Sequence, residues 1–259
     1  MKILVCIKQV FCSENELKIR PDGKWIQETD STDFRMNRFD EYALEEALLI
    51  KETHTNVTVD VISVGPERVN EVIKRGLSKG ADNGIHICYH QSGYCPPQAV
   101  SCMIADYARS QSYDLILTGV MAEDDMQCQV GPMTAGLLSL PCAVSVIKEK
   151  IDIKNKIITV HCEMESGKVE EVLISMPAVL TIQTGINRPR YPSLSNILRA
   201  NSKELTVVDG SFQEEPPDHH ELLSIGYPVT SSRISMLEGS AEEKALQLLS
   251  IFHKKSLLK

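Results

Sequence analysis

The segment from Gly119 to Thr134 has residue types that suit phosphate binding. An apolar run ends at Gly119, and a polar loop leads to Val130 and Gly131 at the start of a predicted helix. The first N–H groups of a helix lack intrahelical partners, and a glycine lets an anion approach them closely. Gln129 and Thr134 add further hydrogen-bond donors. The alternative for the same residues is a polar loop followed by an ordinary capped helix.

The sequence lacks the motifs of nucleotide hydrolysis and of the standard dinucleotide fold. It contains no Gly-x-x-x-x-Gly-Lys-Ser/Thr and no Gly-x-Gly-x-x-Gly. Asp124 and Asp125 are adjacent, so their side chains diverge, and no nearby histidine has the spacing of a metal ligand. We expect these two carboxylates in a solvated loop. The spacing of the histidines supports no catalytic triad.

A second group of candidate residues lies at the start of a predicted helix over residues 41–53. We expect Asp40 to cap this helix and Phe39 to pack beside it as a hydrophobic staple. Asn37 and Phe39 then remain available to a ligand.

The overall composition is that of a globular protein in a reducing compartment. The net charge of -8 argues against nucleic acid as the main partner, because phosphate binding needs a surplus of Lys and Arg. The 8 cysteines include no Cys-x-x-Cys pair, which favours reduced thiols. The apolar runs are too short to insert into a membrane. With no transit peptide visible, the sequence favours a bacterial cytoplasm over a mitochondrial matrix.

The elements that position these residues alternate between strand and helix over the first two-thirds of the chain. We predict strands over 2–8, 57–64, 85–88, 115–119 and 142–147, and helices over 41–53, 66–79, 97–110 and 131–138. This alternation predicts an α/β fold with a mostly parallel, Rossmann-like sheet. Residues 151–163, 169–175 and 178–184 resemble consecutive antiparallel strands added to one side. A small hairpin is expected over 16–28, with its turn at Pro21-Asp22-Gly23.

Beyond Gly185 the periodicity is lost, and repeated prolines interrupt the chain. Only residues 240–252 regain a helical pattern, with Ser240 and Glu243 spaced as a capping box. An arm that crosses onto another subunit explains so long an irregular stretch better than a loop does. We therefore predict a nucleotide-binding α/β domain over 1–190 and a partner-binding segment over 191–259.

Ligands of an open parallel sheet bind beyond the carboxyl ends of its strands. Three segments are predicted to lie at that edge: Cys6 to Val10, Val64 to Pro66, and Gly119 to Thr134. They are the candidate walls of one binding site.

Several of these segments together resemble the small subunits of electron transfer flavoproteins. The similar motifs are Lys2-Ile-Leu-Val-Cys-Ile-Lys-Gln9, Asn37-x-Phe-Asp-Glu-x-Ala-x-Glu-Glu-Ala47, Val64-Gly-Pro66, Gly80-Ala-Asp82, Gln129-Val-Gly-Pro132, and Pro177-Ala-Val-Leu-Thr-Ile182 leading to Asn187-Arg-Pro-Arg-Tyr-Pro-Ser-Leu-Ser-Asn-Ile197. The last two, which form one stretch, are the most specific. The resemblance covers residues 1 to about 200 and resumes in the C-terminal helix.

The resemblance implies an adenine-nucleotide-binding domain that holds AMP, in a heterodimer whose large (alpha) subunit carries most of the FAD site. It also implies that Phe39 lies near the flavin ring. With the helix start described above, the candidate cofactor-binding residues are Cys6, Asn37, Arg38, Phe39, Asp40, Val64, Gly119, Ala122, Asp125, Cys128, Gln129, Val130, Gly131 and Thr134.

The resemblance further implies an electron carrier with no catalytic residues of its own and two kinds of partner. The C-terminal arm is expected to pack on the large subunit. Leu194, between Tyr191 and Ile197, corresponds to a leucine that anchors on a flavin-dependent dehydrogenase. Glu163 corresponds to a carboxylate that controls the motion of the flavin domain.

Three alternatives stay open at this point. Some members of the family hold a second FAD in place of AMP and bifurcate electrons, which would make the assembly enzymatic. An ATP-dependent adenylating enzyme of similar fold would need a Gly/Ser-rich phosphate loop after the first strand, and Gln9 to Ser13 is not one. A stand-alone nucleotide-binding stress protein would lack the segment beyond Gly185.

Overall fold

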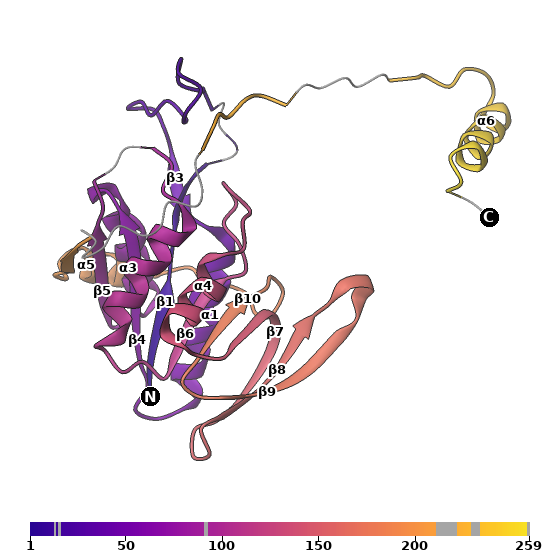
Figure 1. Cartoon of the computed structure of the whole chain (residues 1–259). Helices are drawn as coiled ribbons and strands as arrows, with labels where there is room; N and C mark the ends of the chain where they lie inside the picture. The colour runs from indigo at the N-terminus through magenta and orange to yellow at the C-terminus, as the bar shows by residue number, and fades with distance from the viewer. Residues whose placement is uncertain (13, 15–16, 91–92, 211–221, 229–233, 258–259) are drawn as a thin grey trace. The chain divides into compact units, whose positions relative to one another are not determined.

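The computed structural model describes residues 1–12, 14, 17–90, 93–210, 222–228 and 234–257. These residues form two compact units, Met1–Ile225 and Gly226–Lys259. The first unit contains a large sheet with helices on both faces, and the second contains one helix (Figure 1). The functional division predicted at residue 190 stays a prediction.

The large sheet has nine strands in the order β11-β5-β4-β1-β6-β10-β7-β8-β9. Neighbouring strands pair parallel from β11 to β7, whereas β7, β8 and β9 pair antiparallel. This arrangement confirms the predicted mostly parallel α/β fold with added antiparallel strands. The strands are β1 Lys2–Cys6, β4 Thr58–Gly65, β5 Asn83–Cys88, β6 Leu115–Gly119, β7 Cys142–Asp152, β8 Ile157–Glu163, β9 Val169–Ser175, β10 Ala178–Ile182 and β11 Thr206–Asp209.

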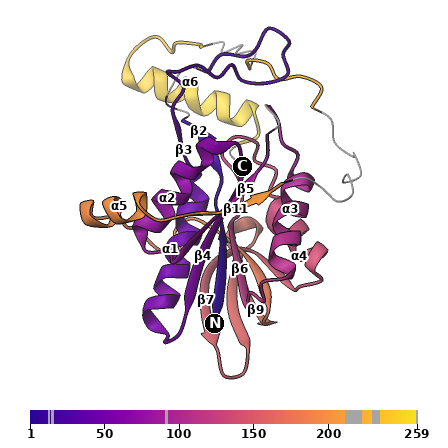
Figure 2. The ribbon, with the colours of Figure 1, turned by 90° about the vertical axis from the view of Figure 1, so that its left-hand side faces the viewer.

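Helices cover both faces of the parallel strands (Figure 2), so β1 buries its side chains on both sides. Ile3 and Val5 belong to the apolar cluster that includes the helices α1 and α2, whereas Leu4 and Cys6 belong to the cluster that includes α3. Successive strand residues point to opposite faces, so this alternation follows from the strand itself. The helices of the first unit are α1 Arg38–Thr53, α2 Asn70–Lys79, α3 Pro97–Arg109, α4 Val130–Leu138 and α5 Leu194–Asn201.

A small antiparallel hairpin leaves the end of β1 and returns to the start of α1. Its strands are β2 Gln9–Phe11 and β3 Phe34–Met36. Within its loop, Ile19 pairs with Ile26 across a turn in which Gly23 takes a left-handed φ of 66°. The turn predicted at residues 21–23 is therefore confirmed; Glu16, where the predicted hairpin begins, lies outside the described residues.

The prediction of consecutive antiparallel strands was wrong for residues 178–184. β10 lies between β6 and β7 and is parallel to both. All five of its residues are buried, as a strand covered on both faces requires. The strand predicted over 151–163 is also divided by a turn, because β7 continues through Asp152 and β8 begins only at Ile157.

The region beyond Gly185 is more regular than its sequence pattern indicates. Ser193 accepts a hydrogen bond from the N–H of Asn196 and begins α5, which packs on α2. β11 then adds an edge strand beside β5. In the second unit, α6 runs over Ala241–Lys254 and begins with the predicted capping box of Ser240 and Glu243. Among the described residues, no helix combines the length and apolar character needed to cross a membrane.

Candidate functional site

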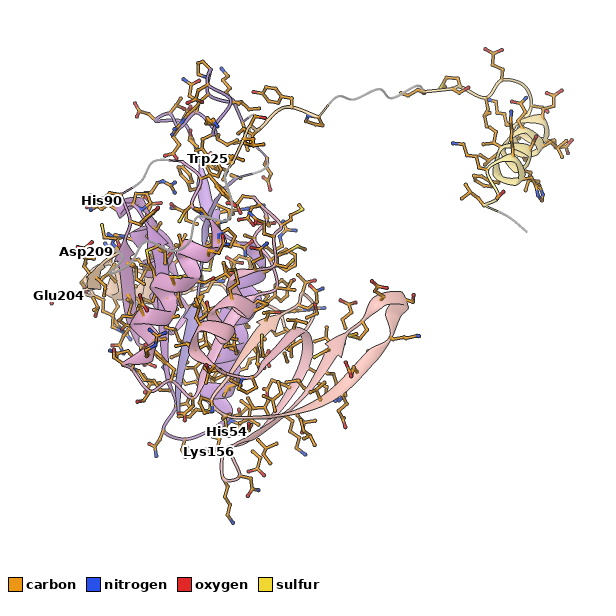
Figure 3. All side chains as sticks on the ribbon, viewed as in Figure 1. Trp25, His54, His90, Lys156, Glu204 and Asp209 are labelled. Atoms are coloured by element: carbon orange, nitrogen blue, oxygen red, sulfur yellow. The ribbon has the colours of Figure 1, made fainter. Side chains whose placement is uncertain are left out.

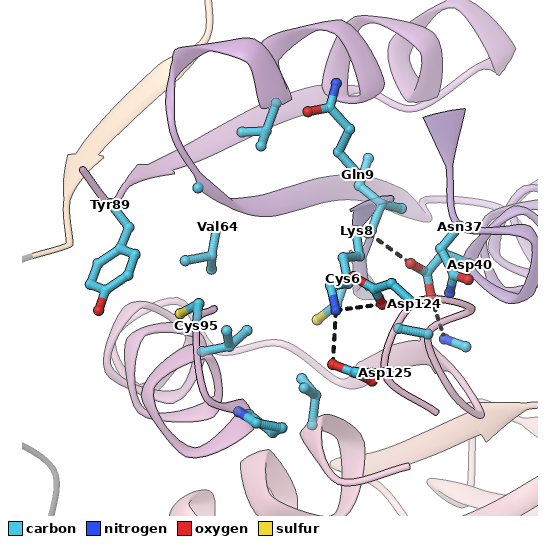
Figure 4. Close-up of a pocket in the computed structure, with 18 of the residues that line it drawn as sticks. Cys6, Lys8, Gln9, Asn37, Asp40, Val64, Tyr89, Cys95, Asp124 and Asp125 are labelled. Atoms are coloured by element: carbon cyan, nitrogen blue, oxygen red, sulfur yellow. Dashed lines mark hydrogen bonds and ion pairs between the residues drawn. The ribbon is translucent and has the colours of Figure 1, made fainter. Parts of the chain in front are cut away.

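A cavity of about 460 Å³ lies at the carboxyl ends of the parallel strands. Its walls come from the ends of β1, β4 and β6 and from the residues that follow β5 (Figure 4). The chain passes from β1 to β4 on one side and later to β6 on the other, so β1 lies at the switch point of the strand order. Open α/β sheets bind ligands at this point, and the volume is within the range of small-molecule sites.

Most of the candidate cofactor-binding residues line this cavity. They are Cys6, Asn37, Asp40, Val64, Gly119, Ala122, Asp125, Cys128, Gln129, Val130 and Gly131. The sequence segments 6–10, 64–66 and 119–131 therefore do meet at one edge of the sheet. Three other candidates, Arg38, Phe39 and Thr134, are not part of the described lining.

Asp40 does not cap α1, which corrects the sequence prediction. The helix begins at Arg38 with Asn37 in the N-cap position, so Asp40 lies within the first turn. Its carboxylate accepts hydrogen bonds from the backbone N–H groups of Lys8, at 2.7 Å, and Gly119, at 3.0 Å. Asp40 thereby joins the ends of β1 and β6 to α1, at the wall of the cavity. Phe39 is likewise inside the helix and not in the staple position before the N-cap.

Asn37 holds the loop after β6 against the start of α1. It is buried; its amide N–H donates to the carbonyl of Met121 at 2.8 Å, and its amide oxygen accepts from the N–H of Glu123 at 3.1 Å. Buried amides need such partners, and here both ends of one side chain are satisfied by one loop. Asn37 therefore shapes the wall formed by residues 120–125.

Burial changes the protonation of two groups in the cavity wall. It raises the pKa of Asp40 to about 7, although hydrogen bonds from Lys8, Asn37 and Gly119 and the charge of Lys8 oppose the shift. Burial, and secondly the charge of Asp40, raises the pKa of the Cys6 thiol far above its ordinary range. Cys6 is thus a protonated thiol at neutral pH and a poor nucleophile.

Asp124 and Asp125 are not the solvated carboxylates that the sequence predicted. The ammonium group of Lys8 lies 2.8 Å from Asp124 and 2.9 Å from Asp125, and the two carboxylate side chains are only 16% and 18% exposed (Figure 4). Burial lowers the pKa of Lys8, but the charges and hydrogen bonds of the two carboxylates outweigh this effect and raise it. The reasoning from adjacency failed because one lysine with a long side chain reaches both carboxylates.

Gly131 is required mainly by packing between α4 and the sheet. A Cβ atom there would lie 2.6 Å from a methyl group of Thr181 and 2.7 Å from the hydroxyl of Thr118. Thr134, one turn further on, is 0% exposed, which leaves it inside the core. The two α4 residues that line the cavity, Val130 and Gly131, carry backbone N–H groups, whereas Pro132 has none and the N–H of Met133 donates to the carbonyl of Gln129.

Sequence reasoning missed an aromatic group beside the cavity. Phe11, Trp25, Phe34 and Tyr94 all line it. The rings of Phe11 and Phe34 lie 5.0 Å apart, and the guanidinium carbon of Arg68 lies 4.1 Å above the Phe34 ring. These residues come from the β2–β3 hairpin, the segment before α3 and the turn after β4. No local sequence pattern brings them together.

The residues predicted for partner recognition are exposed and lie outside the cavity lining. Tyr191 is 91%, Leu194 73% and Ile197 37% exposed. Glu163, at the end of β8, accepts a hydrogen bond from the Gln183 amide at 2.9 Å. The structure leaves all four at the surface of the described unit.

The fold and the cavity together define a Rossmann-like α/β protein with a cavity at the switch point of its sheet. Residues 24–212 match the family model for the electron transfer flavoprotein domain. The chain is 33% identical over 261 residues to electron transfer flavoprotein subunit beta of Methylophilus methylotrophus, with 98% of each chain covered. It is 31% identical over 261 residues to subunit beta of Bacillus subtilis, with 99% of each covered.

The mitochondrial subunit beta of Arabidopsis thaliana is 36% identical over 212 residues, which cover 81% of this chain and 83% of the relative. The chain therefore belongs to the electron transfer flavoprotein family, among its beta subunits. This family assignment confirms the resemblance seen in the motifs.

Proposed function

We propose that this chain is the small subunit of a heterodimeric electron transfer flavoprotein that holds AMP in the cavity at the end of β1. Together with a large subunit it helps to form an FAD site, and the bound flavin supplies the redox chemistry. Electrons then pass from a flavin-dependent dehydrogenase to a downstream acceptor. We further propose a cytoplasmic location, in keeping with the match to subunits from Methylophilus methylotrophus and Bacillus subtilis over nearly their whole length.

The observation that carries the proposal is the division of the cavity into an apolar part and a polar part. Val64, Val100 and Ile104 supply apolar wall for a base, while Gln129, Val130 and Gly131 of the lining carry backbone N–H groups at the start of α4. Backbone donors at a helix start bind phosphate without a charged side chain. The site thus fits a nucleotide by shape and donor type.

The charged and thiol side chains of the same wall are poorly suited to catalysis. The carboxylate of Asp40 accepts two backbone N–H groups, and Cys6 is held as a thiol. Lys8 is paired with two carboxylates. Side chains committed to the structure in this way suit a nucleotide that is held and not turned over.

The test is to purify the chain with its large subunit, denature the complex and identify the released nucleotides by mass. AMP together with FAD would support the proposal. FAD alone, at two molecules per heterodimer, would contradict the AMP site and assign the chain to the bifurcating class. Release of neither nucleotide would overturn the proposal.

A further inference from the structure

An aromatic contact joins two separate loops above the strand ends. The rings of Trp25, from the β2–β3 hairpin, and Tyr94, from the segment before α3, have centroids 5.7 Å apart at an angle of 50°. Phe11 extends the cluster, with its ring 6.3 Å from that of Trp25. All three residues line the cavity, and Figure 3 shows Trp25 at the same end of the unit as His90, another lining residue.

A third loop is attached to this aromatic pair. The side-chain amide of Gln127, in the loop between β6 and α4, donates a hydrogen bond to the hydroxyl of Tyr94. The backbone N–H of Gln127 in turn donates to the carboxylate of Asp125, one of the partners of Lys8. The hairpin, the segment before α3 and the loop after β6 are therefore linked across the cavity by Trp25, Tyr94 and Gln127.

Both rings are partly exposed to solvent. Trp25 and Tyr94 are each half-buried, although they contact each other and the cavity. Large aromatic side chains stack well on flat heteroaromatic rings, and this stacking tolerates different bases because each has a π face. A surface of two linked rings beside a nucleotide-sized cavity matches the chemistry of a purine base or a flavin.

We propose that Trp25 and Tyr94 form an aromatic roof that retains the bound nucleotide by covering its heteroaromatic ring. The inference rests on the proposed function, because it needs an adenine nucleotide in the cavity. The roof acts on release: the nucleotide leaves only after Trp25 and Tyr94 separate, and the Gln127 hydrogen bond opposes that separation. The roof residues position the ligand and take part in no chemistry.

The test compares nucleotide release from five purified heterodimers: the parent, three variants of the roof residues and one control variant. Complexes are diluted, passed through a gel-filtration column at intervals, and the AMP that remains bound is measured by mass. We expect Trp25→Leu to release AMP about 10-fold faster than the parent, since stacking of a base on one aromatic ring contributes on this scale. Trp25→Phe keeps a ring and should stay within about threefold of the parent. Tyr94→Phe keeps the ring but loses the acceptor of Gln127 and should release about threefold faster.

A control variant distinguishes the loss of the Trp25 ring from a general weakening of the hairpin that carries it. Ile19 pairs with Ile26 within the same hairpin and does not line the cavity. Ile19→Ala should therefore weaken the hairpin and leave the rate of AMP release close to that of the parent. Release from Ile19→Ala as fast as from Trp25→Leu would overturn the roof, as would an unchanged rate in Trp25→Leu.

The response of Trp25 fluorescence to AMP gives a second readout. Trp25 is the only tryptophan of the chain, so the difference in emission between the parent and the Trp25→Phe heterodimers belongs to this residue alone. We expect this emission to rise when AMP is removed and to be quenched when AMP is added back. Emission that ignores AMP while AMP binds would overturn the roof and leave the proposed function standing. A parent complex without any adenine nucleotide would overturn both.

Discussion

Arg190 binds Glu45 through three groups at once. The backbone N–H, Nε and Nη2 of Arg190 all lie 2.9–3.0 Å from the carboxylate of Glu45, whose side chain is 5% exposed. Glu45 belongs to α1, and Arg190 immediately precedes the segment that carries Tyr191 and α5. The pair therefore fixes the predicted recognition segment to the helix whose first turn forms part of the cavity wall.

Arg190→Ala is expected to lower the free energy of unfolding of the first unit. The buried carboxylate of Glu45 would keep the hydrogen bond from the backbone N–H of residue 190 but lose the guanidinium group, and removing one member of a buried pair costs about 3 kcal/mol at the lower end of the known range. We choose that lower end because Arg190 itself is 32% exposed. Urea unfolding measures the change. The neighbouring Arg188→Ala is the control and should change stability by less than about 0.5 kcal/mol; equal losses in both variants would contradict the role of the pair.

Glu46 and Glu149 form a second buried contact near this segment, and it predicts a pH dependence. Burial, and then the charge and hydrogen bond of Glu46, raise the pKa of Glu149 to about 7. Asn187 donates to Glu46 at 2.7 Å, so the pair also holds the chain before Arg190. In the unfolded chain Glu149 loses its proton near pH 4.5. The folded state keeps this proton up to about pH 7, so stability must fall as the pH rises between these values.

We expect Glu149 to contribute a fall of about 1–2 kcal/mol in the unfolding free energy from pH 4.5 to pH 7.5, less than the full shift implies because Glu149 is only half-buried. Glu149→Gln should remove the part of the slope that belongs to Glu149 and leave the part that belongs to Asp40, whose pKa burial also raises to about 7. Glu163→Gln, an exposed residue of the adjacent strand, is the matched control. If the pH dependence of stability were the same in Glu149→Gln as in the parent, the folded state would not hold a proton on Glu149.

Leu194 offers the sharpest test of partner docking. It is 73% exposed at the first position of α5, and Leu198 continues the apolar surface one turn later. A single apolar anchor in an interface is worth a tenfold change in affinity or more. Leu194→Ala should therefore slow flavin reduction by the donor dehydrogenase about 10-fold, with FAD content unchanged. Val207→Ala alters an exposed apolar residue of β11 and should leave the rate as it is. Identical kinetics in both variants would remove the docking role.

The sequence predicted the elements best where local pattern decides structure. β6 and β9 have the expected bounds, and Gly80 ends α2 with a left-handed φ of 132°. The pairing of the strands was harder to predict, because the place of β10 between β6 and β7 depends on contacts between residues that are distant in the sequence. β11 escaped notice as a strand of four residues with Val207 exposed.

The candidate site likewise has parts that local sequence pattern predicts and parts that depend on contacts between distant residues. Strand ends placed Cys6, Val64 and Gly119 correctly at one edge, because parallel strands end on the same side. The partners of Asp40 and Asp125 were not predictable, since the N–H of Gly119 and the ammonium of Lys8 approach them only in the folded chain. The contact between Trp25 and Tyr94 likewise joins loops with no shared sequence signal.

We expect the large subunit to bind the apolar face of α6 in the second unit. Leu246 and Leu249 lie three positions apart, so they share one face, and they are 67% and 47% exposed in the described chain. An apolar helix face is stable when another surface covers it. The double substitution of Leu246 and Leu249 by Asp should weaken heterodimer association at least about 100-fold, because two apolar anchors become buried charges.

The effect is measured by the dissociation constant of the two purified subunits, with far-ultraviolet circular dichroism as a check that the first unit remains folded. Lys244→Ala changes a charged residue of the same helix and is expected to leave the constant within about threefold, as an exposed charge contributes little. Because α6 belongs to a unit separate from Met1–Ile225, the double variant should keep the cavity of the first unit. A heterodimer of undiminished affinity would place the binding surface on the first unit instead.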